Sequence, residues 1–327
     1  MPFIKHRNRP HAEADRKAKG LQVPPKSGLD DAAKAKLLLV LLAFCWGLSW
    51  PAMRIALDEI RPWTMRFLGY SIGAVALFAL LRLQGRPITI PRGRAWLHVV
   101  IASLMNVVAF GLCSTFAQLM ASTSRVIIIN YSMPVWGSLM AWLILGERLN
   151  TRTGIGLALC VGGLTALVYP VMAATLQEPI GLLLALGCAL SWAGGTIYMK
   201  WARIEGDLLA ITLWQIVFGV LVFGAGLLIF QGQPTIEPLA MRTWIAIVFN
   251  GVFGTGVAYF IWFNIIGRLS TATASLGSLA NPVVGVIGSV ILLGERPTLP
   301  DIVGFALIFT AAACVLLPQR RAAGSVA

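Results

Sequence analysis

The chain has 327 residues, of which 57% are hydrophobic and only 12% are charged. With a mean hydropathy of +0.79, this composition excludes a soluble globular domain and indicates a protein of the lipid bilayer. The net charge of +13 does not by itself indicate nucleic-acid binding, because nine of the 26 lysines and arginines precede Leu37. Basic residues next to a first apolar segment are typical of an orientation signal, although a nucleic-acid-binding arm would look similar in isolation.

The N-terminal segment, residues 1–35, is polar and contains prolines and glycines without periodicity. We predict that it forms a disordered basic tail. A cleavable signal peptide is not expected, since the apolar run that follows is longer than a signal core.

Ten long apolar stretches follow the tail. A helix needs about 20 apolar residues to cross roughly 30 Å of hydrocarbon, and each stretch is close to that length. Because the stretches are continuous rather than alternating, they predict an all-α membrane protein and not a β-barrel. The predicted spans are residues 36–56, 62–82, 96–118, 126–145, 152–172, 179–200, 208–230, 242–264, 270–293 and 300–317.

The distribution of positive charge predicts the orientation of these spans. With a cytoplasmic N-terminus, all but six of the 26 lysines and arginines fall on the cytoplasmic side. Such an excess is the usual topology signal, and with an even number of spans it places both termini in the cytoplasm. The six basic residues on the opposite side are Arg54, Arg61, Arg66, Arg125, Arg242 and Arg296.

Two sequence segments occur twice in the chain. PVWGSLMAWLILGER at residues 134–148 has a near twin in PVVGVIGSVILLGER at residues 282–296, an offset of 148. Upstream, CWGLSWPAMRIA at residues 45–56 aligns with SWAGGTIYMKWA at residues 191–202, an offset of 146. Since chance similarity between apolar helices would not give nearly equal offsets twice, the chain is predicted to contain an internal duplication.

The duplication divides the chain into two homologous halves, residues 36–172 and residues 179–317. Each half contains five predicted spans, so the second half must cross the membrane in the opposite sense from the first. Inverted repeats of this kind are typical of secondary transporters, in which two similar halves expose a central site alternately to each side.

Three motifs carry a resemblance to a known family. CWGLSWPAMRIAL in the first span, RPWTMRFLGY at the start of the second, and the paired P…LGER units ending the fourth and ninth spans resemble the EamA branch of the drug/metabolite transporter superfamily. The resemblance covers about residues 37–318. It implies ten helices around a central cavity, location in the bacterial inner membrane, and export of small metabolites such as amino acids, or of cationic drugs and other toxic compounds.

The candidate substrate-binding residues are polar and aromatic side chains inside the predicted spans. Polar groups in hydrocarbon are costly, so they line a cavity or bond a neighbouring helix, and both alternatives stay open for each residue. Tryptophans have a third alternative, the membrane interface. Amides, hydroxyls and indoles together favour a zwitterionic or modestly polar substrate with an aromatic or apolar part. The candidates are Trp46, Ser49, Trp50, Asn106, Thr115, Gln118, Asn130, Tyr131, Trp192, Thr196, Tyr198, Gln215, Asn250, Tyr259, Asn264, Ser278 and Asn281.

The two Gly-Glu-Arg corners each end a predicted span. Glu147 and Glu295 could carry a coupling proton, but at a span end water is close and a structural role fits better. We expect the glycine to end the helix in a left-handed conformation and the glutamate to face the N-terminus of the next helix.

Arg66 and Arg125 lie about one turn inside predicted helix ends. We expect both to extend their guanidinium groups to the interface. The alternative is that they line the outer mouth of a cavity and steer a carboxylate, with Asp58 or Glu59 as resting partners.

Enzymatic functions find no support in the sequence. Two of the three histidines lie in the tail, the five cysteines match no metal-site spacing, and no phosphate-binding loop is present. We expect no catalytic residues, cofactor or metal, and as partners a small-molecule substrate and the bilayer but no nucleic acid. Monomer and homodimer stay open, as does a second hypothesis, a membrane scaffold or signalling protein acting through the basic tail.

Overall fold

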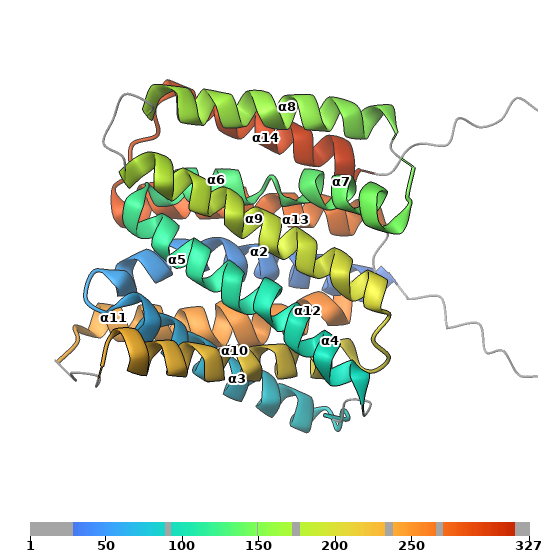
Figure 1. Ribbon diagram of the computed structural model, residues 1–327, viewed down its shortest axis with the longest axis vertical. Helices are drawn as coiled ribbons and strands as arrows, with labels where there is room; N and C mark the ends of the chain where they lie inside the picture. The colour runs from blue at the N-terminus through green and yellow to red at the C-terminus, as the bar shows by residue number, and fades with distance from the viewer. Residues whose placement is uncertain are drawn as a thin grey trace, which may run out of the picture.

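The computed structural model describes residues 29–88, 93–148, 150–171, 177–232, 238–265 and 271–317, and all regular structure in these ranges is helical (Figure 1). The elements are α2 (Leu29–Leu57), α3 (Pro62–Leu83), α4 (Arg94–Ser103), η1 (Leu104–Ala109), α5 (Phe110–Met120), α6 (Thr123–Asn130), α7 (Met133–Leu145), α8 (Thr151–Val168), η2 (Tyr169–Val171), α9 (Gln177–Ala202), α10 (Leu208–Phe230), α11 (Met241–Phe249), η3 (Asn250–Val257), α12 (Ala258–Ile265), α13 (Thr271–Leu293) and α14 (Leu299–Leu316).

These elements join into ten helical units that match the ten predicted spans, so the predicted all-α membrane fold is confirmed. Among the described residues, nine units are long and apolar enough to cross a membrane, and Gly277–Leu293 of α13 is a shorter apolar helix. Helix α2 begins at Leu29, seven residues before the predicted span, because its first turns are polar and fall outside an apolar window. The rest of the predicted tail, residues 1–28, lies outside the described residues.

The third unit of each half contains a π-helical segment, which the sequence did not predict. Segment η1 lies between α4 and α5, and η3 lies between α11 and α12. The two segments begin 146 residues apart, the same offset as one of the sequence repeats. Because π-helical turns are rare and concentrate at functional sites, their duplication marks Asn106 and Asn250, one in each segment.

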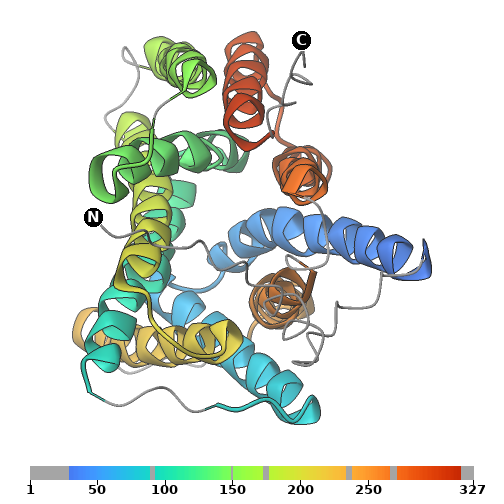
Figure 2. The same cartoon turned by 90° about the vertical axis from the view of Figure 1, so that its right-hand side faces the viewer.

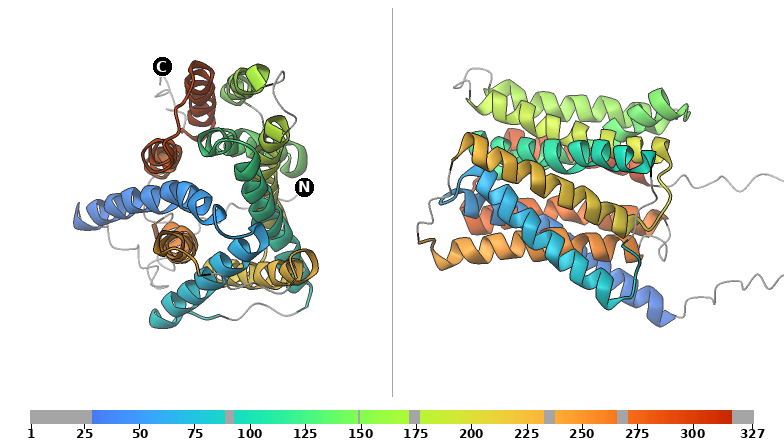
Figure 3. Two further views of the ribbon diagram at one scale, coloured as in Figure 1. Left: turned by 90° about the vertical axis from the view of Figure 1, so that its left-hand side faces the viewer. Right: turned by 60° about the horizontal axis from the view of Figure 1, so that its bottom comes forward.

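The two halves interlock through their first helices. Helix α2 packs against α11, η3 and α13 of the second half, and α9 packs against η1, α5, α6 and α7 of the first half. Helices α8 and α14 pair at one margin of the bundle, and α3 and α10 lie at the opposite margin (Figures 2 and 3). Because each first helix packs against the other half, the centre of the bundle consists of two groups of helices. The α2 group is α2 with α11, η3 and α13, and the α9 group is α9 with η1, α5, α6 and α7.

The inverted sense of the halves is visible at the two Gly-Glu-Arg corners. The Glu147 carboxylate accepts a hydrogen bond from Lys200 at the end of α9, whereas Glu295 contacts the start of α6. Since the α6–α7 unit runs the length of the bundle (Figure 1), the two corners lie at opposite ends. We refer below to the Glu147 end and the Glu295 end.

The predicted helix-ending glycines are confirmed, but the predicted role of the glutamates is wrong. Gly146 and Gly294 have φ angles of 71° and 69°, in the left-handed region that glycine adopts without strain. The N-terminus of α8 is capped by Asn150, and that of α14 by Thr298 with Asp301. Both following helices are therefore capped by residues of their own, which leaves the corner glutamates to bond elsewhere.

Candidate functional site

A cavity of about 500 Å³ lies between the α2 group and the α9 group. Its lining comes from both halves and includes residues of α2, α3, η1, α6, α9, η3 and α13. A volume of this size suits a small organic molecule. The cavity occupies the position that inverted repeats leave between them, near the middle of the spans.

Most of the predicted binding residues line this cavity. They are Trp46, Ser49, Trp50, Asn106, Asn130, Tyr131, Trp192, Thr196, Gln215, Asn250, Tyr259, Ser278 and Asn281. For these residues the structure favours a cavity position over the membrane interface, and their role in binding stays a prediction.

Four predicted residues lie outside the cavity lining and hold other groups. The Thr115 hydroxyl accepts a hydrogen bond from Arg66, and the Gln118 side chain donates to the Trp50 carbonyl over 3.3 Å. The Tyr198 hydroxyl lies 2.7 Å from His98 Nδ1, and Asn264 Oδ1 accepts from Arg86 over 2.8 Å. Three of these contacts are the helix-to-helix alternative that the sequence left open, and the fourth joins α12 to Arg86 in the segment after α3.

Five aromatic side chains form one wall of the cavity. Trp46 meets Tyr259 edge to face with 6.1 Å between ring centroids, and Tyr259 stacks on Trp192 at the same distance. Trp192 contacts Phe110 at 5.0 Å, and Phe110 contacts Trp50 at 6.3 Å. This aromatic wall runs from α2 through α12, α9 and α5 back to α2 and offers a continuous apolar surface to a ligand.

The polar part of the cavity lining comes from a set of side-chain amides. Asn106 donates to Gln215 Oε1 over 3.3 Å, and Asn250 donates to the Ser49 carbonyl over 2.9 Å. The side-chain oxygens of Asn106, Asn130 and Asn281 are buried without a hydrogen-bond partner. An unpaired buried acceptor is costly, and each of these three oxygens has almost no accessible surface.

Arg66 lies in the cavity lining, contrary to the expectation that it extends to the interface. Its side chain is only 5% exposed. Its Nε donates to the Gly111 carbonyl over 2.9 Å and to Thr115, and its Nη2 donates to Ser114 Oγ over 2.6 Å. Polar groups of α5 face α3 here, so the guanidinium bonds to them instead of reaching back to water.

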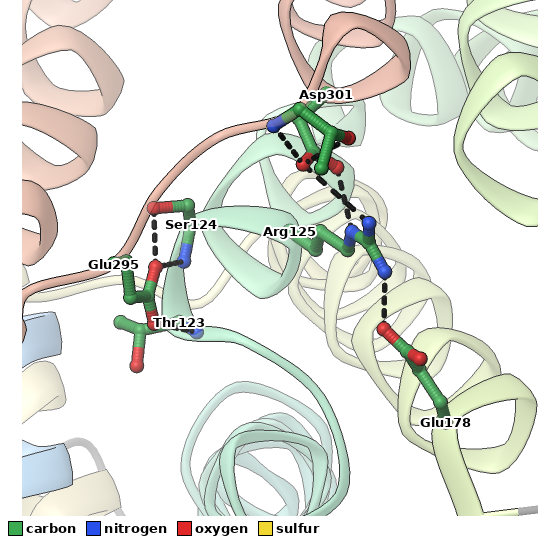
Figure 4. A network of polar contacts seen from close by, with 7 residues as sticks. Thr123, Ser124, Arg125, Glu178, Glu295 and Asp301 are labelled. Atoms are coloured by element: carbon green, nitrogen blue, oxygen red, sulfur yellow. Dashed lines mark hydrogen bonds and ion pairs between the residues drawn. The ribbon is translucent and has the colours of Figure 1, made fainter. Parts of the chain in front are cut away.

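Arg125 is also held inside the bundle and not at the interface. Its Nε donates to Asp301 Oδ1 over 2.6 Å, and its Nη1 pairs with Glu178 (Figure 4). These ion pairs connect α6, α14 and α9. The expected partners Asp58 and Glu59 bond elsewhere, Asp58 to Arg54 and Glu59 to the start of α11.

The two ends of the cavity differ in exposure. Toward the Glu295 end, the lining residues Met53, Arg66 and Ser114 are buried. Toward the Glu147 end, Thr196 is exposed and Leu316 is half-buried. The cavity is therefore closed at the Glu295 end and more exposed at the Glu147 end.

The model of the EamA-like transporter family matches residues 33–169 and again residues 179–317. The chain belongs to the EamA-like transporter family. This confirms the resemblance seen in the three motifs, and it assigns the chain to a family of transporters rather than enzymes.

Relatives of this EamA-like transporter include bacterial proteins matched along nearly their full length. The uncharacterized transporter YoaV of Bacillus subtilis is 25% identical, covering 84% of this chain and 94% of its own. A probable amino-acid metabolite efflux pump of Escherichia coli is 25% identical, covering 85% of this chain and 93% of its own. A solved crystal structure shares the fold, with a TM-score of 0.61 and 20% identity over 86% of this chain and 96% of that one.

For Arg66 the sequence offered a cavity position only as the alternative, and it missed other lining residues of this EamA-like transporter, among them Tyr70, Phe110, Ser114 and Thr255. Arg66 and Tyr70 are four residues apart and therefore share one face of α3. An arginine and a tyrosine on the same helical face, four residues apart, were the available signal for a polar cavity wall.

Proposed function

We propose that this EamA-like transporter is a secondary carrier that exports small organic metabolites, chiefly amino acids with aromatic or apolar side chains, by alternating access across the bacterial inner membrane. The observation that carries the proposal is a cavity between interlocked inverted halves that is closed at one end and more exposed at the other. Such a state is one of the two that alternating access requires.

The direction of export follows from the expected orientation. The excess of lysine and arginine predicts that the Glu147 end faces the cytoplasm. A cavity exposed at that end could take substrate from the cytoplasm, and opening of the Glu295 end would release it outside. Two relatives named probable amino-acid metabolite efflux pumps support this direction and this class of substrate.

The aromatic wall and the amides support an amino acid better than a cationic drug, the alternative cargo. Carriers of organic cations would profit from a carboxylate near the ligand, yet none of the described lining residues is acidic. Arg66 would instead repel a cation at short range.

The test is transport in proteoliposomes with labelled substrates. We expect counterflow of phenylalanine and leucine, weaker counterflow of glycine, and none of a cationic dye. The variants Trp192→Ala and Asn250→Ala should reduce transport while inserting normally, with Trp96→Ala, a half-exposed residue outside the cavity, as the matched control. Transport of the dye alone, or of none of these compounds, would overturn the proposal.

Deletion of the basic tail distinguishes the carrier proposal from a second hypothesis, a scaffold that acts through this tail. A chain lacking residues 1–28 should transport as the full chain does if the carrier proposal holds. Loss of function with normal insertion and an unchanged cavity would favour the scaffold instead.

A further inference from the structure

We infer that Arg66 binds the carboxylate of the substrate and thereby selects zwitterions over amines of the same shape. This inference rests on the proposed carrier function and names the chemical feature that its cavity recognises.

The guanidinium of Arg66 is positioned before any ligand binds. The Thr115 hydroxyl donates to the Gly111 carbonyl over 2.8 Å, and the Ser114 hydroxyl donates to the Phe110 carbonyl over 2.7 Å. With their protons directed to the helix, both hydroxyl oxygens present lone pairs to Arg66. A side chain fixed in this way loses little freedom when a ligand arrives.

The charge of Arg66 has no counter-ion among the described residues. The groups that accept hydrogen bonds from it are one backbone carbonyl and two hydroxyls, all neutral. The Tyr70 ring, 5.7 Å from the guanidinium carbon, adds a weak attraction but no charge. A buried cation in a membrane protein is expensive and is retained where it pairs with a functional partner.

The contrast with Arg125 shows that this chain does supply carboxylates where an arginine is structural. Arg125 lies in the same half of the bundle and is paired with both Asp301 and Glu178. Arg66 is more deeply buried, 5% exposed against 14% for the Arg125 side chain, yet it has no carboxylate partner among the described residues, and unlike Arg125 it lines the cavity. A planar guanidinium with free donors is the group that recognises a carboxylate through two parallel hydrogen bonds.

The rest of the cavity fits the other parts of an amino acid. Asn106, Asn130 and Asn281 line the same cavity, and side-chain amides are groups that can accept hydrogen bonds from an ammonium group. The aromatic wall offers a surface for an apolar or aromatic side chain. A carboxylate, an ammonium and an apolar side chain are thus each matched by groups of the same cavity.

The experiment compares phenylalanine with two analogues, each lacking one charge. Phenylalaninamide has no carboxylate, and 3-phenylpropionate has no ammonium group. Binding of all three is measured by calorimetry on the purified full chain in detergent. Wild-type protein should bind phenylalanine at least tenfold more tightly than phenylalaninamide, and it should retain measurable binding of 3-phenylpropionate.

The variants assign this preference to one side chain. Arg66→Gln should lose at least tenfold in affinity for phenylalanine while its affinity for phenylalaninamide changes less than twofold, and Arg66→Lys should fall between. Arg54→Gln, which removes a partly exposed arginine near the Glu295 end, is the matched control and should bind as the wild type does. Size-exclusion profiles establish that each variant folds.

Three outcomes distinguish failure of the inference from failure of the proposed function. If the wild type prefers phenylalanine and Arg66→Gln keeps that preference, the carrier proposal stands and the role of Arg66 is overturned. If the wild type binds phenylalaninamide as tightly as phenylalanine, the inference fails without the use of any variant. Binding of 3-phenylpropionate but not phenylalanine, with loss in Arg66→Gln, would retain the carboxylate role and overturn the amino-acid assignment.

Discussion

The two Gly-Glu-Arg corners have nearly the same sequence and different environments. Glu295 accepts hydrogen bonds from the backbone amides of Thr123 and Ser124, 2.6 and 2.9 Å long, at the N-terminus of α6 (Figure 4). Glu147 pairs instead with Lys200, and both side chains are at least half exposed. The cavity is closed at the Glu295 end and more exposed at the Glu147 end, so the corner that binds a helix N-terminus is the one at the closed end.

This difference indicates that the same motif can form a bonded corner at the closed end of an inverted repeat and an exposed corner at the open end. Glu295 follows α13, which packs with α2, whereas α6 packs with α9, so its bonds connect the two groups across the cavity mouth. A carboxylate at a helix N-terminus is stabilised by the amide donors and by the helix dipole. We expect the state open at the Glu295 end to break these bonds, and four predictions test that comparison.

The largest effect is expected from the ion pair beside the Glu295 corner. Asp301→Ala removes the buried partner of Arg125 and the cap of α14. Removing one member of a buried pair should lower the free energy of unfolding by about 3 kcal/mol, measured by denaturation in mixed micelles. Asp58→Ala, which breaks the exposed pair with Arg54, is the control and should change it by less than about 0.5 kcal/mol. Equal effects of the two variants would contradict a structural difference between them.

Glu295→Gln should open the closed end without unfolding the protein. Loss of a charged cap costs about 1 kcal/mol, which shifts a two-state equilibrium roughly fivefold toward the state lacking the bond. The readout is thiol labelling of Met53→Cys, in a chain whose five native cysteines are replaced by alanine, with a membrane-impermeant reagent added at the Glu295 face. Labelling that is no faster than in the parent chain would show that this corner does not hold the mouth closed.

Glu147→Gln provides the counterpart at the other corner. Because its ion pair with Lys200 is solvent-exposed, we expect a change below about 0.5 kcal/mol in the free energy of unfolding. Labelling of Met53→Cys should not rise. If Glu147→Gln accelerated labelling as much as Glu295→Gln, the two corners would be equivalent in this state and the comparison would fail.

The smallest effect concerns Glu59, a second acid at a helix N-terminus of the Glu295 end. The Ala240 amide donates to its carboxylate over 2.9 Å and lowers the pKa of Glu59 below its ordinary value. A lowered pKa means that its contribution is present above the ordinary pKa and is lost as the pH falls through the lowered value. The difference in melting temperature between wild type and Glu59→Gln should therefore shrink on acidification from pH 7 to pH 3. A difference that grew would contradict this sign.

The sequence was most informative where a signal is local. The length of each apolar stretch predicted the spans, and Gly146 and Gly294 predicted where two helices end. Both signals depend on residues that are neighbours in the chain. The partners of Arg125 and Glu295 were not predictable in this way. Arg125 and Asp301 are 176 positions apart, and they meet only because α6 and α14 come together at one end of the bundle.

The same reasoning explains the error at Arg66. Its depth of one turn in α3 is compatible with extension to the interface, and only the packing of α5 beside α3 supplies the hydroxyls that turn it inward. Most of the polar cavity residues could be predicted, since hydrocarbon leaves polar side chains few alternatives. Which of them share one hollow and which only join helices depends on contacts between the halves.

The exchange of first helices has a consequence for biosynthesis. The partners of α2 in the finished protein include α13, which leaves the ribosome more than 200 residues later. Until then, the face of α2 that carries Gly47, Leu48 and Pro51, which packs on α13, has only lipid or a chaperone to cover it. Truncated chains that stop after the first half should consequently be recognised as unassembled and degraded, and two separately expressed halves should survive only when each is made in the presence of the other.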